Sequence, residues 1–232
     1  MRWLTVGGAL AAVLVGTSVF AVGGIWASLP MIGFFISASM LPRALRRSHQ
    51  TEQRTARQVV ANGLAPTLCC WGILLYPEHE ASFWSGYAAS LTAAAADTWA
   101  TEFGMCYADT AWHIITGKRV PKGTSGAVSF IGTLSGAFGA VMVGSLTMPL
   151  LPPYPLQSLL ICSLGVGGMR LDSLLGATLQ ARYQCTSCGV EGEQPICCDA
   201  PAVLVRGVRW MDNDMVNLLS TLTAAAVGIA IG

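Results

Sequence analysis

Long apolar runs separated by short polar segments dominate the pattern of hydrophobic and polar positions along this chain. Runs of roughly 17 to 25 mainly apolar residues have the length of helices that cross a bilayer. Such runs occupy residues 4–21, 24–41, 59–76, 83–100, 127–149, 157–180 and 215–231. Gly23 and Gly24 interrupt one longer apolar stretch, so the first two runs are predicted to form a helical hairpin. The pattern predicts an all-α, polytopic membrane protein with about seven transmembrane helices in one bundle.

The composition supports a membrane environment. Hydrophobic residues make up 53% and charged residues 11% of the 232 positions, and the mean hydropathy is +0.56, outside the range of ordinary soluble domains. We therefore expect residues 1–232 to form a single integral membrane domain with the lipid bilayer as its partner. A cleavable signal peptide at residues 1–21 is the alternative for the first run, but the sequence stays apolar past any small-residue cleavage site.

Basic residues are distributed unevenly among the predicted loops, although the net charge is only +1. Segment 43–58 holds five arginines, and segments 103–126 and 181–214 hold the further loop cations, whereas connections 77–82 and 151–155 hold none. Because cytosolic loops are enriched in Lys and Arg, we expect a cytosolic N-terminus and an external C-terminus, in the cell membrane if the source is prokaryotic. The charge pattern gives no support to a nucleic-acid partner.

Acidic residues interrupt this apolar chain at points that reach the same predicted membrane face. An unpaired charge at bilayer depth costs about 2.5 to 3.5 kcal/mol on insertion scales, so such residues are candidates for function. On a helix, residues at i and i+4 share a face, which pairs Asp97 with Thr101 and Thr98 with Glu102. The other acidic residues of the candidate site are Asp172, Asp212 and Asp214.

Polar stripes continue on two further helices. Asp172 and Ser173 begin one stripe, and Asn213, Asn217 and Thr221 repeat at i, i+4 and i+8 on the other. In a bundle, three helices with one polar face each are predicted to surround a shared cavity.

A glycine-rich segment supplies the features of a phosphate site. Lys122 precedes Gly123, Thr124, Ser125 and Gly126, which are predicted to form a turn that opens the next helix. Backbone N–H groups at a helix N-terminus suit a phosphate, although the segment is not a Walker A motif. Carboxylates opposite such a turn suggest Mg²⁺ between them, because Mg²⁺ prefers a few carboxylates together with substrate phosphates.

Structural roles are the alternative for several of these residues. Asp97, Glu102 and Asp172 could pair with Arg170 or Lys122 to hold the bundle together. Asp212 and Asp214 could be acids that a helix N-terminus favours. The glycines of the fifth apolar run are expected to be a close-packing surface; these are Gly132, Gly136, Gly139 and Gly144.

Four cysteines fall in a predicted cytosolic loop at about 181–212. Cys185 and Cys188 form a CxxC pair, and Cys197 and Cys198 are adjacent. A structural zinc knuckle is one interpretation, but adjacent cysteines fit one tetrahedral site less readily than a second CxxC pair would.

Four ordered segments resemble one family of membrane proteins. They are Ala96–Gly104, Val120–Gly126, Asp172–Gln180 and Asp212–Asn217, and the likeness runs from about Gly7 to the C-terminus. These motifs are similar to those of the membrane family known as domain of unknown function 92, which includes a plant phytyl-phosphate kinase. Arg170 departs from the family pattern, where an apolar residue is usual.

The resemblance implies an enzyme, a prenyl-phosphate kinase that transfers a phosphoryl group from a nucleoside triphosphate such as CTP to a prenyl monophosphate. It implies Mg²⁺ at Asp97, Glu102, Asp172 and Asp212 or Asp214, with Asp97, Glu102 and Asp172 catalytic. The expected substrate- or nucleotide-binding residues are Asn62, Lys122, Gly123, Thr124, Ser125, Gly126, Ser173, Asn213 and Asn217. The alternative functions are a proton- or cation-coupled transporter or lipid flippase, and a scaffold without catalysis.

Overall fold

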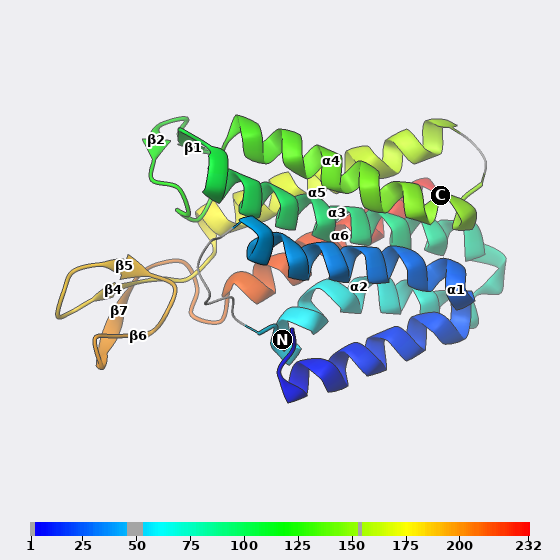
Figure 1. Cartoon of the computed structure of the whole chain (residues 1–232), viewed down its shortest axis with the longest axis horizontal. Helices are drawn as coiled ribbons and strands as arrows, with labels where there is room; N and C mark the ends of the chain where they lie inside the picture. Colours follow the sequence, from blue (N-terminus) through cyan, green and yellow to red (C-terminus); the bar gives the residue numbers. More distant parts are fainter. Residues whose placement is uncertain (1–2, 46–52, 153–154) are drawn as a thin grey trace.

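A bundle of long helices makes up most of the molecule (Figure 1). The computed structural model describes residues 3–45, 53–152 and 155–232. Its α-helices are α1 (Val6–Leu45), α2 (Ala56–Leu75), α3 (Glu80–Tyr107), α4 (Phe130–Thr147), α5 (Pro155–Thr178) and α6 (Asn213–Ile231). Within the described ranges, five of them are long and apolar enough to cross a membrane, namely α1, α2, α4, α5 and α6.

Helix α1 is interrupted at Gly24, where φ is 55° and ψ is −145°. This left-handed conformation favours glycine, since a Cβ would be strained there. The two halves of α1 run back alongside each other (Figure 1), and the ring of Trp3 lies 6.1 Å from that of Phe35. The predicted division of the first apolar stretch at Gly23 and Gly24 is confirmed.

Helix α3 lies inside the bundle because small residues cover its sides. Residues 84–96 are buried, and many of them are alanine. Gly132, Gly136 and Gly139 of α4 let that helix approach so closely that an added Cβ would lie 2.8–3.0 Å from a backbone carbonyl oxygen of α3. The predicted close-packing role of these glycines is confirmed.

The end of α3 differs from the sequence prediction. The helix continues to Tyr107, not to residue 100, because the polar stretch after Asp97 remains helical. Asp97 and Glu102 therefore lie inside the helix and not at its end.

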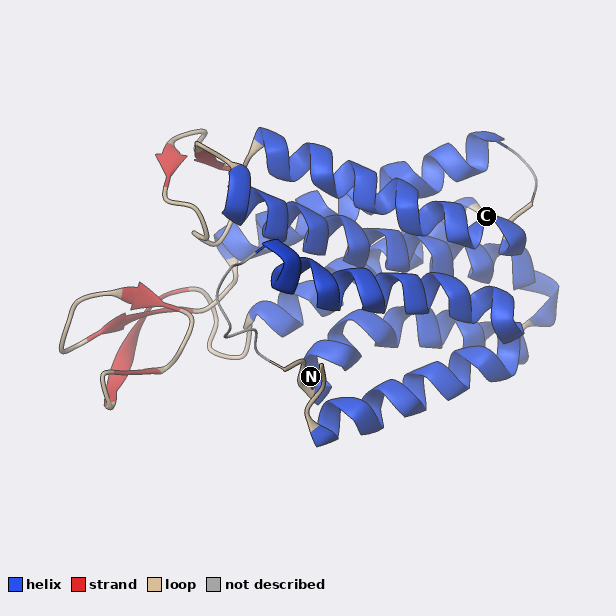
Figure 2. Ribbon diagram, viewed as in Figure 1, coloured by secondary structure: helices blue, strands red, loops and turns tan. Residues whose placement is uncertain are grey.

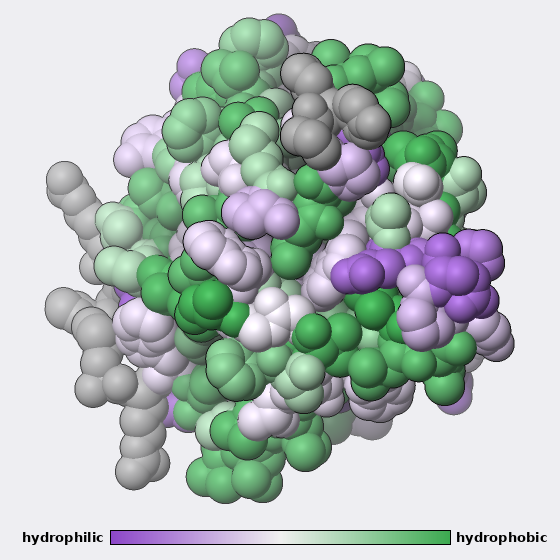
Figure 3. Space-filling view, turned by 90° about the vertical axis from the view of Figure 1, so that its right-hand side faces the viewer, coloured by the Kyte–Doolittle hydropathy of each residue, from purple (hydrophilic) through white to green (hydrophobic). Residues whose placement is uncertain are grey.

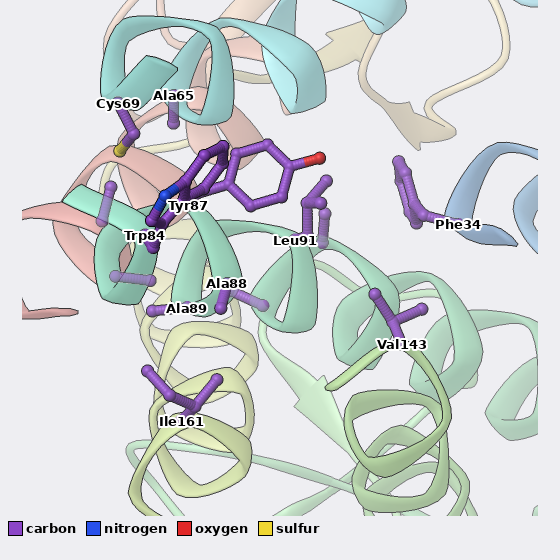
Figure 4. Close-up of a cluster of buried hydrophobic side chains, with 14 of the residues drawn as sticks. Phe34, Ala65, Cys69, Trp84, Tyr87, Ala88, Ala89, Leu91, Val143 and Ile161 are labelled. Carbon is purple, nitrogen blue, oxygen red and sulfur yellow. The ribbon is translucent and has the colours of Figure 1, made fainter. Parts of the chain in front are cut away.

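The main hydrophobic core lies where α1, α2, α4 and α5 contact α3 (Figure 4). Tyr87 is fully buried and its hydroxyl donates a hydrogen bond to the carbonyl oxygen of Ala27. The ring of Trp84 packs edge-on against Tyr87 at 5.5 Å, and Leu91 lies in the same cluster. Large apolar side chains also cover the outside of the bundle, as a lipid-facing surface requires.

Two small sheets lie at the end of the bundle where the N-terminus lies, and the C-terminus lies at the other end (Figures 1 and 2). One sheet has the order β2-β1-β3, from β1 (Ala111–His113), β2 (Arg119–Val120) and β3 (Ala127–Val128). The other has the order β5-β4-β7-β6, from β4 (Arg182–Cys185), β5 (Glu191–Gly192), β6 (Ile196–Cys197) and β7 (Ala200–Arg206). The all-α prediction describes the bundle correctly but omits these sheets. We call residues 182–206 the cysteine lobe.

The opposite end of the bundle carries short connections. The 3-10 turns η1 (Pro77–His79) and η2 (Met148–Leu150) are found there, and connections 77–82 and 151–155 contain neither Lys nor Arg. Figure 3 views this end and shows mostly apolar or weakly polar surface, with hydrophilic residues gathered mainly towards one edge. Within the described ranges, the basic residues of the loops collect at the end that carries the two sheets.

Candidate active site

A cavity of about 190 Å³ lies at the end of the bundle that carries the sheets. Its wall combines residues of four helices, α3, α4, α5 and α6, with the segment that precedes α4. The helical residues are Asp97, Thr101, Thr133, Arg170, Asp172, Ser173 and Asn213, and the connecting segments add Lys122 through Ser129, Gln180 and Glu193. Acidic, basic and hydroxyl-bearing side chains therefore share one partly open cavity, as suits a charged ligand.

Two acids from different helices meet in this cavity. The carboxyl groups of Asp97 on α3 and Asp172 on α5 lie close enough to share a hydrogen bond when one of them is protonated. Ser220 of α6 donates a further hydrogen bond of 3.4 Å to Oδ2 of Asp172. Two carboxylates this close repel each other unless a proton or a cation lies between them. The pair offers oxygen ligands of the kind that Mg²⁺ prefers, and open cavity remains for a substrate beside them.

The close approach of α3 and α5 explains why these acids meet. A Cβ on Gly165 or Gly168 of α5 would lie 2.8 Å or less from the side chain of Thr92 or Ala93. The contact continues along both helices to the level of Asp97 and Asp172.

The glycine-rich turn forms another part of the cavity wall. Gly123 and Gly126 have φ of 80° and 81°, and the carbonyl oxygen of Pro121 accepts hydrogen bonds from Thr124 N and Oγ1. A Cβ on Gly126 would lie 2.4 Å from the Cβ of Ala177, so only glycine allows the turn to contact α5. The turn therefore lies against the helix that carries Asp172.

The prediction that this turn opens a helix is wrong. Strand β3 follows Gly126, and α4 begins at Phe130 with Ser129 as its N-cap. The Ser129 hydroxyl accepts a hydrogen bond from the Gly132 N–H. The dipole of α4 is therefore directed at Ser129, which also lines the cavity, and not at Gly123 to Gly126.

Two cavity residues have donors suited to phosphate oxygens. Gln180 is buried, and within the described part of the chain its Nε2 atom has no hydrogen-bond partner. Arg170 is exposed on α5, and its Nη2 donates a hydrogen bond of 3.1 Å to Thr133 Oγ1 on α4. A buried donor without a partner is costly, so Gln180 fits a site that an oxygen-rich ligand completes. The polar stripe predicted from Asp172 onwards extends to Gln180, but neither Gln180 nor Arg170 is among the predicted binding residues.

The cysteine lobe reaches the same cavity. Arg182 Nη1 lies 3.6 Å from Glu193 Oε1 and 3.5 Å from Ser125 Oγ, and Ser125 Oγ lies 3.4 Å from Glu193 Oε1. Sequence reasoning missed Arg182 and Glu193 because neither belongs to a motif. The sole sequence feature that pointed to a role for Arg182 was its position shortly after the end of α5.

Several predicted residues lie outside the cavity lining. Glu102 is buried and does not line the cavity. Burial lowers the pKa of Arg54, and the nearby negative charge of Glu102 partly opposes this shift. Asp212 accepts a hydrogen bond from Met215 N as the N-cap of α6 and lies 2.5 Å from Arg57, while Asp214 lies 3.7 Å from the same arginine. The contacts of Asp212 and Asp214 fit a role at the start of α6, whereas Glu102 lies near Arg54 and not near the predicted partners Arg170 or Lys122.

The remaining predicted binding residues do not all line one cavity. Asn213 and Ser173 line the cavity, whereas Asn217 does not. Asn62 lines a separate cleft of about 520 Å³ between α1 and α2, whose surface is mainly apolar.

The four cysteines of the lobe gather in one place. Their sulfur atoms lie within 4.8 Å of one another. Backbone N–H groups of Cys188 and Ser187 are directed at the sulfur of Cys185 and lower the pKa of its thiol to about 6. These thiols could hold a metal ion.

Comparison with known proteins identifies the family. The family model described as "Integral membrane protein DUF92" matches residues 1–225. This chain belongs to the DUF92 family. The match covers every helix except the end of α6, so the DUF92 assignment includes the whole cavity.

Individual relatives come from archaea, cyanobacteria and plants. The uncharacterized membrane protein MJ0933 of Methanocaldococcus jannaschii is 27% identical over 87% of this chain and 72% of its own length. The uncharacterized membrane protein sll0875 of Synechocystis is 28% identical over 94% and 78%. Protein VTE6, chloroplastic, of Arabidopsis thaliana is 24% identical over 97% of this chain and 64% of its own length. No solved structure matches this DUF92 protein.

Proposed function

We propose that this DUF92 protein is an integral membrane prenyl-phosphate kinase. It transfers a phosphoryl group from a nucleoside triphosphate, with CTP as the first choice, to an isoprenoid monophosphate such as phytyl phosphate. The observation that carries the proposal is the cavity in which the acids Asp97 and Asp172 face Lys122 and the glycine-rich turn. The resemblance to a family with plant phytyl-phosphate kinases, and the similarity to Protein VTE6, support the same reaction.

The acids would provide the metal site. Asp97 and Asp172 would hold Mg²⁺ through carboxylate oxygens, and Thr101 and Ser173 provide hydroxyl oxygens in the same cavity. When bound, Mg²⁺ would neutralise the charge of the triphosphate. We place Glu102, Asp212 and Asp214 outside this set, as residues that hold helix ends through Arg54 and Arg57.

The phosphate groups would contact another part of the cavity wall. Lys122, the backbone N–H groups of the glycine-rich turn and the Nε2 atom of Gln180 would bind oxygens of the nucleotide. Arg170 would bind the monophosphate of the lipid, since it lines the cavity and is also exposed on the outer side of α5. The isoprenoid chain would then leave the cavity past Arg170 into the lipid.

The reaction needs positioning more than proton transfer. An anionic oxygen of the lipid monophosphate forms a bond to the γ-phosphorus as the bond from that phosphorus to the bridging oxygen breaks, and the nucleoside diphosphate leaves. The attacking oxygen is already ionised near neutral pH, so no general base is required. Alignment of the two phosphates and stabilisation of their negative charge supply the rate enhancement.

The proposed topology places this chemistry in the cytosol. If the two halves of α1 and helices α2 to α6 each cross the membrane, the chain crosses seven times. The end with both sheets, the cavity and the basic loops then faces the cytosol, which is also where nucleotides are found.

The decisive experiment uses protein purified in nanodiscs. Nucleotides labelled at the γ-phosphate, CTP first, are incubated with prenyl monophosphates of different chain length, with and without Mg²⁺. Label is expected in a prenyl diphosphate only when Mg²⁺ is present, and Asp97→Asn is expected to abolish it. Asp109→Asn is the matched control, because Asp109 is exposed and lies outside the cavity lining. Absence of transfer from every nucleotide would refute the proposal.

A proton-coupled transporter is the second candidate, because the contact between Asp97 and Asp172 could hold a shared proton. Transporters usually bind their substrate near the middle of the membrane, whereas this cavity lies at one end of the bundle. Lipid movement in liposomes that depends on a pH gradient and needs no nucleotide would favour the transporter.

A further inference from the structure

The cysteine lobe is too small and too open to be held together by its apolar side chains. Val190, Ile196, Val203 and Val205 are all exposed, between 46% and 66% of their surface. Segments of this size usually need disulfides or a metal ion to keep one conformation. The four cysteines of the lobe are not joined by disulfides.

The spacing of the sulfur atoms fits a tetrahedral metal. The Sγ atom of Cys197 lies 3.9 Å from that of Cys188 and 3.8 Å from that of Cys198. A Zn²⁺ ion with four thiolates at about 2.3 Å separates neighbouring sulfurs by about 3.8 Å. A disulfide would bring two of the sulfurs to about 2.05 Å. The observed spacing therefore matches one shared ion.

The first pair of cysteines lies in a turn shaped like a zinc knuckle. Cys185 ends β4, and its carbonyl oxygen accepts a 3.0 Å hydrogen bond from the N–H of Gly189. Gly189 has a φ of 71°, which lets the chain reverse directly after Cys188.

A β-hairpin turn, and not a CxxC turn, positions the adjacent residues Cys197 and Cys198. Cys197 pairs with Ala200 across the β6–β7 hairpin, so Cys198 and Asp199 are its two loop residues. Both have positive φ, 53° and 55°, as the central residues of a type I′ turn do. This tight reversal turns the Cys198 sulfur back towards Cys197. The hairpin thus replaces the second CxxC pair that the sequence lacks.

We propose that the cysteine lobe binds one structural Zn²⁺ through Cys185, Cys188, Cys197 and Cys198, and that this ion holds the lobe against the glycine-rich turn. The ion would fix the end of β4, the strand that begins with Arg182. Arg182 and Glu193 then keep their contacts with Ser125 at the cavity. Zinc binding thus orders one wall of the cavity without contacting a substrate.

The test measures metal content and local order in the full-length protein, purified with a tag that binds no metal. Elemental analysis is expected to find about one zinc per chain in wild type. Cys185→Ser combined with Cys188→Ser is expected to reduce bound zinc at least tenfold. Cys106→Ser is the matched control, because Cys106 lies outside the cluster and should leave the zinc content unchanged.

A second measurement avoids variants that fail to fold. A mercurial reagent titrated into wild-type protein is expected to release zinc in proportion to the reaction of four thiols. Amide hydrogen exchange in segments 182–185 and 121–129 is then expected to become at least about tenfold faster, because the lobe loosens. Neither readout depends on kinase activity, so the zinc proposal and the proposed function can fail separately.

Three results would overturn the proposal. They are wild-type protein with less than about a tenth of an equivalent of zinc, protein that carries iron in its place, and cysteines found as disulfides. Unchanged exchange in segment 121–129 after zinc release would overturn the link between the lobe and the glycine-rich turn.

Discussion

Asp97 on α3 and Asp172 on α5 bring their carboxyl groups into contact inside the cavity, although long segments of chain separate them. Each acid depends on the other's position, because a metal held between them needs oxygens from both. The lysine and glycine-rich turn in the same cavity complete a site of mixed charge. This arrangement leads to the first prediction.

Neutralising either acid is expected to stop catalysis while the protein still folds. Asp97→Asn and Asp172→Asn keep the size of the side chain but remove a charge that Mg²⁺ requires. Each is expected to reduce phosphoryl transfer at least about a hundredfold, with little loss of thermal stability, since a repulsive pair of acids is relieved. Transfer rates and thermal unfolding in nanodiscs measure both effects, with Asp109→Asn as the control. Full turnover in either variant would show that the pair does not bind the metal.

Replacement of Glu102 is expected to lower stability while catalysis is nearly unchanged, the opposite of the result expected for Asp97 and Asp172. Its charge lies near Arg54, which donates a hydrogen bond of 2.9 Å to the Ala38 carbonyl oxygen at the end of the α1 hairpin. Glu102→Gln removes the countercharge of a largely desolvated arginine, which typically costs about 3 to 5 kcal/mol for a buried pair. A lower melting temperature with a kcat within about threefold of wild type is the expected result. A hundredfold loss of kcat with unchanged stability would return Glu102 to the catalytic set.

The sequence could have predicted that the side chains of Asp97 and Glu102 lie on different sides of α3. Five residues along an α-helix correspond to a rotation of about 140°, so these two acids cannot share a face. The i, i+4 pairing of Asp97 with Thr101 pointed to the correct side, and both residues line the cavity. Grouping all acids by depth in the membrane placed Glu102 together with Asp97, whereas Glu102 does not line the cavity.

Other parts of the site depend on contacts that no local pattern shows. The glycines of α4 and the break at Gly24 follow from small residues in apolar runs, and the sequence predicted both. The strands at the cavity have only two to seven residues each, too few for a periodicity to show. Glu193 contacts Ser125 although 68 positions separate them in the sequence, and no local pattern indicates such a contact. Arg170 was set aside because it departs from the family pattern, but it lines the cavity.

Glycine at position 126 is expected to be essential because of a close contact. Gly126 and Gly117 both have positive φ, but an added Cβ would meet Ala177 at 2.4 Å at position 126 and nothing within 4 Å at position 117. Gly117→Ala is therefore expected to show the backbone strain alone, about 1 kcal/mol. Gly126→Ala adds a clash with α5 and should lose most nucleotide binding. Unfolding curves and nucleotide titrations on both variants separate strain from clash, and equal behaviour of the two would contradict the role of the contact.

The last prediction concerns the nucleotide. Lys122 is exposed at the start of the glycine-rich turn and lines the cavity that Asp97 and Asp172 share. A triphosphate bound between the turn and a metal at the acids would lose one charge contact when the lysine is removed, and such contacts are worth about 1.5 to 3 kcal/mol. Lys122→Ala should therefore raise the nucleotide KM more than about tenfold, while affinity for the prenyl monophosphate changes little, because we assign that phosphate to Arg170. Lys118→Ala, an exposed lysine outside the cavity lining, is the control for a general change in surface charge. Separate binding titrations of nucleotide and lipid, with and without Mg²⁺, measure both affinities. If Lys122→Ala weakens lipid binding instead, the two phosphates occupy the reverse positions in the cavity, and if nucleotide binding needs neither Mg²⁺ nor Lys122, the cavity does not bind a metal–triphosphate complex.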